Sequence, residues 1–232
     1  MIITDWRKDV YAGNRIFLGS RYGEARCVRR LLFSAVLVLV FAFISSIPAA
    51  AEKPGPSDVI KRFNAALLES MKKADELGYK GRYEFLGPVI RDSFALSFMA
   101  DQSVGRYWRG LKEEERKTFL KTYTEWTIST YAARFDGYSG EKFETVSESG
   151  PERGTVTVLS KLIESDKETV DFYYKLRRMD NRWLIVDIQM SGVSQLALTR
   201  SQFVSVIKDK GFDSLMAMLK KKIDAFSKGK EQ

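Results

Sequence analysis

The residue types that support most enzyme chemistry are missing from this chain of 232 residues. It contains no histidine, and its single cysteine, Cys27, comes before an apolar run at residues 31–44. Serine, cysteine and metal-dependent hydrolases generally rely on an imidazole, a thiolate or a cluster of soft ligands. The sequence therefore favours a binding function over these mechanisms, and it predicts neither a metal site nor a bound cofactor.

Two aspartates are the remaining candidates for catalysis. Asp171 and Asp187 lie within stretches of alternating apolar residues. A half-buried carboxylate is usually paired with a cation, and Arg177, Arg178 and Arg182 are candidate partners. The alternative is a catalytic base, as in ketosteroid isomerases, which combine an aspartate with a tyrosine in the oxyanion hole. The spacing identifies no such tyrosine, and both interpretations stay open.

The N-terminal residues have the pattern of a secretory signal peptide. Arg26, Arg29 and Arg30 precede the apolar run, and a Pro-Ala-Ala-Ala stretch at residues 48–51 follows it. A basic region, an apolar stretch of about 7–15 residues and an Ala-x-Ala site together mark such a peptide. We expect cleavage after Ala51 and export to the periplasm.

This cleavage divides the chain into an N-terminal extension with the signal peptide, residues 1–51, and a mature domain, residues 52–232. The alternative is a retained membrane anchor, because the run counted on to Ile47 approaches the roughly 18 residues of a spanning helix. The mature part keeps 31 basic and 27 acidic residues, a net charge of +4 against +8 for the whole chain. This balance is too weak to favour nucleic acid as a partner.

Apolar residues recur at steps of three and four along several segments, which predicts amphipathic helices. These segments cover residues 57–77, 83–98, 101–111, 112–135, 193–208 and 212–226. We expect the first helix to end at Gly78 and the second to be interrupted at Gly87 and Pro88.

Between these helices the apolar period changes to alternation, which predicts strands at residues 143–148, 155–163, 169–179 and 183–190. Their connections are short enough to imply an antiparallel meander. Helices on both sides of a meander indicate a single α+β domain. One face of the third strand then carries Val170, Phe172, Tyr174 and Leu176, and one face of the fourth carries Leu184, Val186, Ile188 and Met190.

Several short stretches, in a fixed order, carry a resemblance to a known family. They are Tyr-Ala-Ala-Arg-Phe-Asp-Gly-Tyr-Ser-Gly at 131–140, Val-Asp-Phe at 170–172, Trp-Leu-Ile-Val-Asp-Ile at 183–188 continuing to Gly-Val-Ser at 192–194, Arg-Ser-Gln-Phe at 200–203, and Gly-Phe-Asp-Ser-Leu at 211–215. In this order they resemble the toluene-tolerance/MlaC family, the periplasmic lipid-binding components of a phospholipid ABC transport system. The resemblance runs from about Ser57 to about Lys222. Residues 78–83, 135–140 and 194–201 are similar to the hopanoid-biosynthesis-associated, HpnM-like branch.

This resemblance implies a curved four-stranded antiparallel sheet, related to the NTF2-like fold, with helices enclosing an apolar cavity. Acyl tails would lie inside and the head group near solvent. The expected ligand is a phospholipid or a hopanoid. The expected partners are an inner-membrane ABC transporter or MCE-type complex and an outer-membrane lipoprotein complex. The alternative function is that of an NTF2-like enzyme acting on an apolar substrate.

Aromatic residues are the candidates for the cavity wall, since they make up 12% of the chain and their rings supply large rigid apolar surfaces. We expect the wall to contain Trp126, Tyr131, Phe172, Tyr174, Val186 and Ile188, with Phe94, Phe98 and Trp108 behind them. The alternative for any one of them is a place in an ordinary core.

Two groups of basic residues are possible contacts for lipid head groups. Lys220, Lys221 and Lys222 could touch an anionic lipid surface, but such a run is usually a solvated helix end that also suits the helix dipole. The segment 106–109 (Arg-Tyr-Trp-Arg) combines cations with rings, and helix packing explains it equally well.

The signal-peptide interpretation makes a direct prediction. Protein recovered from the periplasm should begin at or near Glu52, because the small-residue site follows a short apolar run. N-terminal sequencing checks this. A membrane-bound protein that retains residues 31–44 would instead show that the run is an anchor.

Overall fold

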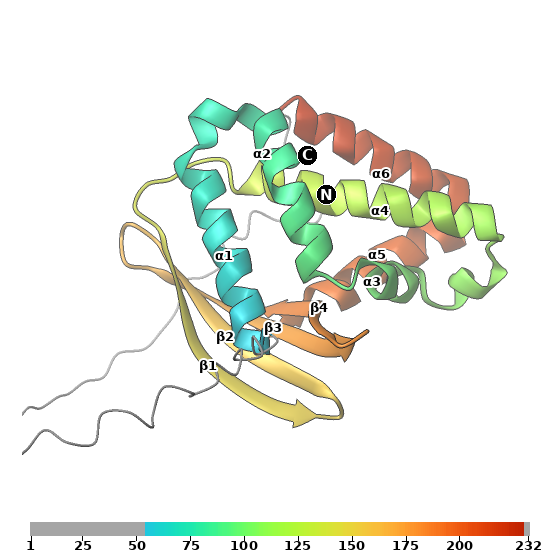
Figure 1. The fold of residues 1–232 in the computed structure, drawn as a ribbon. Helices are drawn as coiled ribbons and strands as arrows, with labels where there is room; N and C mark the ends of the chain where they lie inside the picture. Colours follow the sequence, from blue (N-terminus) through green and yellow to red (C-terminus); the bar gives the residue numbers. More distant parts are fainter. Residues whose placement is uncertain (1–53, 230–232) are drawn as a thin grey trace, which may run out of the picture. The chain divides into compact units, whose positions relative to one another are not determined.

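An antiparallel sheet and a set of packed helices form the part of the chain that this computed structural model describes, residues 54–229 (Figure 1). The predicted signal peptide and its cleavage site lie outside these residues. Within the described range, no helix has the length and apolar character needed to cross a membrane. Strands and helices occur together in one compact unit, so the predicted α+β domain is confirmed.

The sheet is the predicted antiparallel meander. Its strands are β1 (Lys142–Glu152), β2 (Thr155–Ile163), β3 (Thr169–Met179), β4 (Arg182–Met190) and β5 (Val193–Ser194). They pair in chain order, and each pairing is antiparallel. The two-residue β5 adds a short edge to the four strands that alternation predicted.

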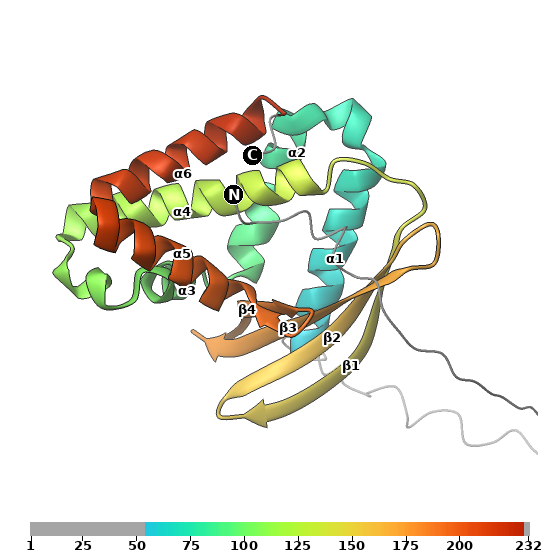
Figure 2. The same cartoon turned by 180° about the vertical axis from the view of Figure 1, so that it is seen from behind.

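The helices pack on this sheet and on one another. They are α1 (Pro56–Lys72), α2 (Ala74–Ser93), α3 (Leu96–Val104), α4 (Glu113–Arg134), α5 (Gln195–Lys210) and α6 (Phe212–Ser227), with a 3-10 helix, η1, at Gly105–Gly110. Helix α1 crosses the sheet and contacts β1, β2 and β4, while α4 packs between α2 and α6. Figures 1 and 2 show α4 and α6 side by side from opposite directions.

The first two helices differ from the prediction in where they break. The chain leaves helical geometry at Lys73, so α1 ends there and not at Gly78. Gly78 instead forms a kink inside α2, with a φ of +56° that favours glycine. The predicted interruption at Pro88 is wrong: α2 continues through it, because Pro88 and Glu84, whose carbonyl loses its helical partner, both lie on the exposed side.

The face of the sheet that packs under α1 is continuous across β2, β3 and β4. On β3, Val170, Phe172, Tyr174 and Leu176 are all buried, as predicted. On β4 the prediction is partly wrong, because Val186 is an extra residue in the pairing with β3 and forms a bulge. The bulge shifts the alternation, so that Ile185, and not Leu184, lies opposite Leu176.

A buried polar chain fixes α1 on this face. The hydroxyl of Tyr174 donates to Asn64 Oδ1 (3.2 Å), and Asn64 Nδ2 donates to Ser160 Oγ (2.8 Å). The hydroxyl of Ser160 in turn donates to the carbonyl oxygen of Glu144 (3.1 Å). Buried polar groups stabilise a structure only when they are paired in this way. These linked hydrogen bonds therefore tie α1 to β1, β2 and β3.

The two strand aspartates have other partners than the predicted arginines. Asp187 is buried, and its Oδ1 accepts hydrogen bonds from the backbone N–H groups of Ile188 (2.8 Å) and Leu196 (3.0 Å). Leu196 is in the first turn of α5, where Ser194 Oγ accepts a second bond, from Ala197 (3.0 Å). Asp187 therefore caps a helix N-terminus, where a negative charge is favourable.

Asp171 is half-exposed and faces Lys161 at 3.8 Å. The predicted arginine partners are engaged elsewhere. Arg177 donates to Thr155 Oγ1 (3.0 Å), Arg178 donates to Asn181 Oδ1 (2.7 Å), and Arg182 pairs with Asp92. Asp187 follows the bulge at Val186 and reaches the start of α5, only nine residues further along the chain, through a contact that the strand pattern alone does not show.

We predict that Asp187→Ala lowers the free energy of unfolding by about 1–2 kcal/mol, because it leaves the part-buried N–H of Leu196 in α5 without an acceptor. Asp171→Ala is the matched control and should cost less than about 0.5 kcal/mol, since its pair is exposed. Urea unfolding of both variants checks this. An equal loss of unfolding free energy in the two variants would show that the cap at Asp187 stabilises the protein no more than the Asp171 ion pair does.

Candidate functional site

Aromatic side chains from α1, α4 and the sheet meet in one group, which we name the interlayer cluster. Its members are Phe63 on α1, Phe94 after α2, Tyr131 and Phe135 at the end of α4, Phe143 on β1, and Phe172 and Tyr174 on β3.

The ring contacts of the interlayer cluster form a closed circuit. Starting from Phe63, the ring centroids lie 5.4 Å from Tyr131, then 5.8 Å on to Phe135 and 6.4 Å on to Phe143. The circuit returns through Phe172 (6.4 Å) and Tyr174 (6.0 Å), which lies 6.2 Å from Phe63. These separations are typical of favourable aromatic pairs. A continuous aromatic wall therefore joins the helices to the sheet.

Tyr131 differs from its neighbours in this cluster. Phe63, Phe94 and Phe135 are buried, whereas Tyr131 keeps an intermediate exposure. At the same time burial raises the pKa of the Tyr131 hydroxyl well above its ordinary value, although Arg134 opposes the shift. Its hydroxyl is thus surrounded by protein while part of the side chain stays accessible to water.

Two further tyrosine hydroxyls lie in the same region. Burial raises the pKa of Tyr123 and of Tyr174, and in each case the proximity of Tyr131 adds to the shift. The carboxylate of Asp187 also raises the pKa of Tyr123. Sequence reasoning missed this approach of Tyr123 to Asp187, because α4 and β4 are far apart along the chain.

Most of the predicted wall residues belong to one of two aromatic clusters. Phe94, Tyr131, Phe172 and Tyr174 all belong to the interlayer cluster, and Ile188 lies directly across from Tyr174 on the neighbouring strand. Val186 is buried but occupies the bulge. Phe63, Phe135 and Phe143, which were not proposed as site residues, complete the circuit. The helical period of α1 predicted that Phe63 is buried but could not show what it faces.

Two other predicted residues, Trp108 and Trp126, lie in a second group, the helical cluster, which also contains Phe119, Tyr123, Phe203 and Phe212. Trp108 is at its far end, where the Arg116 guanidinium lies over its ring at 5.6 Å. Phe98 lies apart, under the guanidinium of Arg177 at 5.6 Å. Trp126 contacts Tyr123 and Phe203, with ring centroids 5.5 Å apart in each pair.

Trp126 also carries an unpartnered polar atom. Its side chain is only 8% exposed, and its Nε1 has no hydrogen-bond partner within residues 54–229. Buried N–H groups without a partner are rare in folded proteins.

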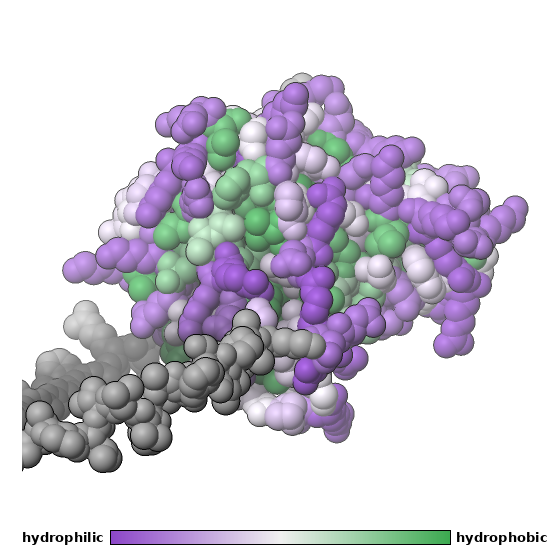
Figure 3. Space-filling model, in the orientation of Figure 1, coloured by the Kyte–Doolittle hydropathy of each residue, from purple (hydrophilic) through white to green (hydrophobic). Residues whose placement is uncertain are grey.

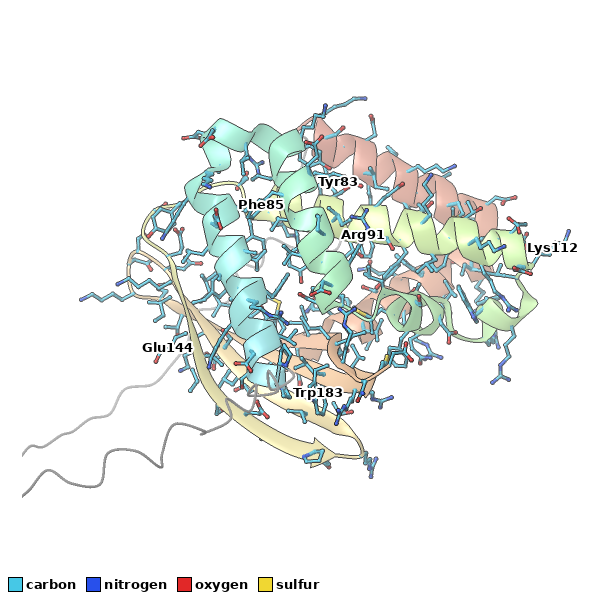
Figure 4. The ribbon with its side chains drawn as sticks, in the orientation of Figure 1. Tyr83, Phe85, Arg91, Lys112, Glu144 and Trp183 are labelled. Carbon is cyan, nitrogen blue, oxygen red and sulfur yellow. The ribbon has the colours of Figure 1, made fainter. Side chains whose placement is uncertain are left out.

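The surface formed by α1 and α2 is partly apolar. In the view of Figure 3, hydrophobic residues gather over α1 and α2 and are bordered by hydrophilic side chains. Phe85 belongs to α2, has intermediate exposure, and lies on the side of α2 that faces α1 (Figure 4).

The basic residues of α6 are not all alike. Lys220 and Lys221 are exposed, as expected of a solvated helix, but Lys222 is partly buried. Burial lowers the pKa of Lys222, and the nearby guanidinium of Arg134 adds to the effect. In the 106–109 segment, Arg106 lies over the ring of the adjacent Tyr107. Over the described residues, histidine, cysteine and carboxylate side chains form no group that could hold a metal ion.

The raised pKa values of Tyr123, Tyr131 and Tyr174 predict a loss of stability at alkaline pH. Their pKa values lie above the ordinary 10.0 in the folded protein but not in the unfolded chain, so unfolding above about pH 10 releases protons. Their stabilising contribution is complete below the unfolded pKa and is lost as the pH rises through the folded one. Urea unfolding should therefore give a free energy that falls above about pH 10.

Tyr131→Phe should make this decline shallower, while Tyr138→Phe, at an exposed position, should leave it unchanged. Near-ultraviolet absorbance of tyrosinate follows the ionisation directly. Ionisation at ordinary pH values in the folded protein would contradict the burial of these hydroxyls.

Comparison with known proteins gives consistent matches. A family model described as MlaC protein matches residues 61–221. The chain is 23% identical over 195 residues to the intermembrane phospholipid transport system binding protein MlaC of Haemophilus influenzae. This aligned region covers 81% of this chain and 90% of that protein. A phospholipid-binding protein from Ralstonia solanacearum, solved in complex with a phospholipid, has a similar fold, with a TM-score of 0.66 and 18% identity. That match covers 75% of this chain and 99% of the other.

Proposed function

The chain belongs to the MlaC family, and we propose that it is a periplasmic carrier that encloses the tails of a phospholipid or hopanoid and passes the lipid between membrane-bound complexes. The single observation that carries this proposal is the state of Tyr131. Its hydroxyl is deep enough for burial to raise its pKa, yet its side chain keeps accessible surface. We infer that a side chain in this state borders a space between α1, α4 and β3 that an apolar ligand can enter.

The interlayer cluster supplies a wall suited to such a ligand. Aromatic rings bury large areas with few rotatable bonds, so they bind an acyl chain without losing much conformational entropy. Apolar burial contributes about 25 cal/mol per Å². The names of the two similar proteins, both phospholipid-binding, support a lipid as the ligand. The similarity to the hopanoid-associated branch remains a prediction about which lipid is carried.

A carrier accounts for Asp187 better than an enzyme does. Asp187 Oδ1 accepts hydrogen bonds from two backbone N–H groups, so this carboxylate already has a structural role at the N-terminus of α5. The carboxylate of Asp187 raises the pKa of the nearby Tyr123 hydroxyl. We therefore propose that the protein catalyses no reaction.

The proposed partners follow from this role. A periplasmic carrier needs a complex that supplies lipid and one that receives it. We propose an inner-membrane ABC transporter or MCE-type complex on one side and an outer-membrane lipoprotein complex on the other. The word intermembrane in the name of the Haemophilus influenzae relative supports two membranes as the end points.

Mass spectrometry of protein purified from the periplasm tests the function. A carrier should retain a diacyl lipid or a hopanoid through purification, in a ratio near one lipid per protein or below. The mature protein should also take up lipid from vesicles and deliver it to others. Protein that is folded, free of lipid and inactive in both transfers would refute the proposal.

The position of the lipid can be tested with Ile188→Trp. Ile188 lies across from Tyr174, so an added indole there should take up ligand volume, and the folded variant should lose its co-purified lipid. In a solid core the same change would mainly destabilise the protein, by about 1–3 kcal/mol, and leave lipid content intact. Val193→Trp is the matched control, because Val193 is 50% exposed on β5. Normal lipid content in both variants would place the lipid elsewhere.

A further inference from the structure

Four arginine side chains gather where η1 leads into α4, and we name this group the arginine tip. They are Arg106 and Arg109 on η1, Arg116 on α4 and Arg200 on α5. A 3-10 helix has three residues per turn, so Arg106 and Arg109 lie on the same side of η1, and both are exposed. Lys112, directly before α4, marks this end of the helical layer, away from the sheet (Figure 4).

Short contacts hold the tip together. Arg116 Nε donates to the carbonyl of Trp108 (3.1 Å), and Arg116 Nη2 donates to the carbonyl of Arg109 (3.1 Å). Arg200 packs against Gly105, the first residue of η1, where an added Cβ would lie 2.8 Å from Arg200 Nη2. Three separate helices therefore bring their guanidinium groups to one place on the surface.

No carboxylate neutralises these four charges within residues 54–229, because none of the four guanidinium groups forms an ion pair there. Three glutamates follow η1 along the chain, but they are engaged locally. Glu113 and Glu114 pair with Lys117 (2.9 and 3.0 Å), and Glu115 Oε2 accepts from the backbone N–H of Lys112 (2.6 Å). Clustered charges of one sign create a field that attracts an anionic partner.

Aromatic and apolar side chains lie among these charges. Tyr107, Trp108 and Leu111 all keep an intermediate exposure. The guanidinium of Arg106 lies over the Tyr107 ring at 5.2 Å, and that of Arg116 lies over the Trp108 ring at 5.6 Å. Tyrosine and tryptophan are enriched at membrane–water interfaces, because their rings are apolar at one end and polar at the other. An acidic protein surface would match the charges, whereas a bilayer offers both phosphates and an adjoining apolar layer.

We propose that the arginine tip docks the protein on the surface of an anionic lipid bilayer, with the guanidinium groups on lipid phosphates and the rings of Tyr107 and Trp108 at the level of the head groups. A planar guanidinium binds phosphate through two parallel hydrogen bonds, which suits arginine to this contact. The inference goes beyond the proposed carrier function, since none of the four arginines belongs to the interlayer cluster.

Cosedimentation with vesicles tests the docking surface. Protein purified from the periplasm is mixed with vesicles of phosphatidylethanolamine and phosphatidylglycerol, and separately with vesicles of phosphatidylcholine alone. The variant lacks two charges of the tip, through Arg106→Ala and Arg109→Ala together. The matched control carries Lys220→Ala and Lys221→Ala, which remove the same charge from exposed positions on α6. Arg200→Ala is a further variant that leaves η1 unchanged.

The wild type should bind the anionic vesicles, release them as salt is added, and ignore phosphatidylcholine. Each basic residue near an anionic surface contributes roughly fivefold to binding, so the double arginine variant should bind about 30-fold more weakly and Arg200→Ala about fivefold more weakly. The double lysine control should stay within about threefold of the wild type, because its charges lie away from the contact.

A wild type without preference for anionic vesicles, or an equal loss in the arginine and lysine variants, would overturn the inference. Binding to polyglutamate without binding to anionic vesicles would also overturn it and assign the tip to an acidic protein surface. Lipid that co-purifies with the double arginine variant should be unchanged by mass spectrometry, and its loss would contradict a docking role separate from the lipid site. Protein that docks but never carries lipid would refute the carrier function and leave the arginine tip standing.

Discussion

The position of α1 over the sheet is the constraint on which the rest of the structure depends. Asn64 sets it, since its amide oxygen accepts from Tyr174 and its amide nitrogen donates to Ser160. Neither bond tolerates a slip of α1 by one turn, because a buried amide without partners would cost more than the bonds contribute. The next residue back, Phe63, is thereby placed against Phe94, Tyr131 and Tyr174. The two hydrogen bonds of Asn64 thus position the aromatic wall.

The same constraint explains why the wall contains tyrosines as well as phenylalanines. A wholly apolar interface between α1 and β3 would allow several similar packings, since apolar contacts have little directionality. Tyr174 contributes both a ring to the cluster and a hydroxyl to the polar chain. A further polar contact, the helix cap at Asp187, fixes where α5 leaves the sheet. The helices are therefore oriented by a few polar contacts, while the apolar side chains supply most of the stabilising area.

The features that could be predicted from the sequence are those with a local cause. Alternation gave the strands within a few residues, because the period of two is a property of each strand alone, and the predicted helix at 112–135 agrees with α4 at Glu113–Arg134. The breaks at Lys73 and Val186 could not be predicted, since each depends on how a helix or strand fits its neighbours. Asp187 was expected to pair with a nearby arginine, whereas its partner comes from the N-terminus of α5. Likewise, the aromatic content indicated a wall, but only the packing of α4 separates Trp126 from Tyr131 into different clusters.

For a lipid carrier, the relevant comparison is with a bilayer and not with water. A lipid tail is already surrounded by apolar groups in a membrane, so the roughly 25 cal/mol per Å² that favours burial from water largely cancels when the tail moves from bilayer to protein. The aromatic wall then makes transfer possible without driving it strongly in either direction. Small polar differences decide the balance, because one hydrogen bond of about 0.5–1.5 kcal/mol is no longer a minor addition to a large apolar term. A lipid that is held with so small a net preference can still be released to a membrane complex.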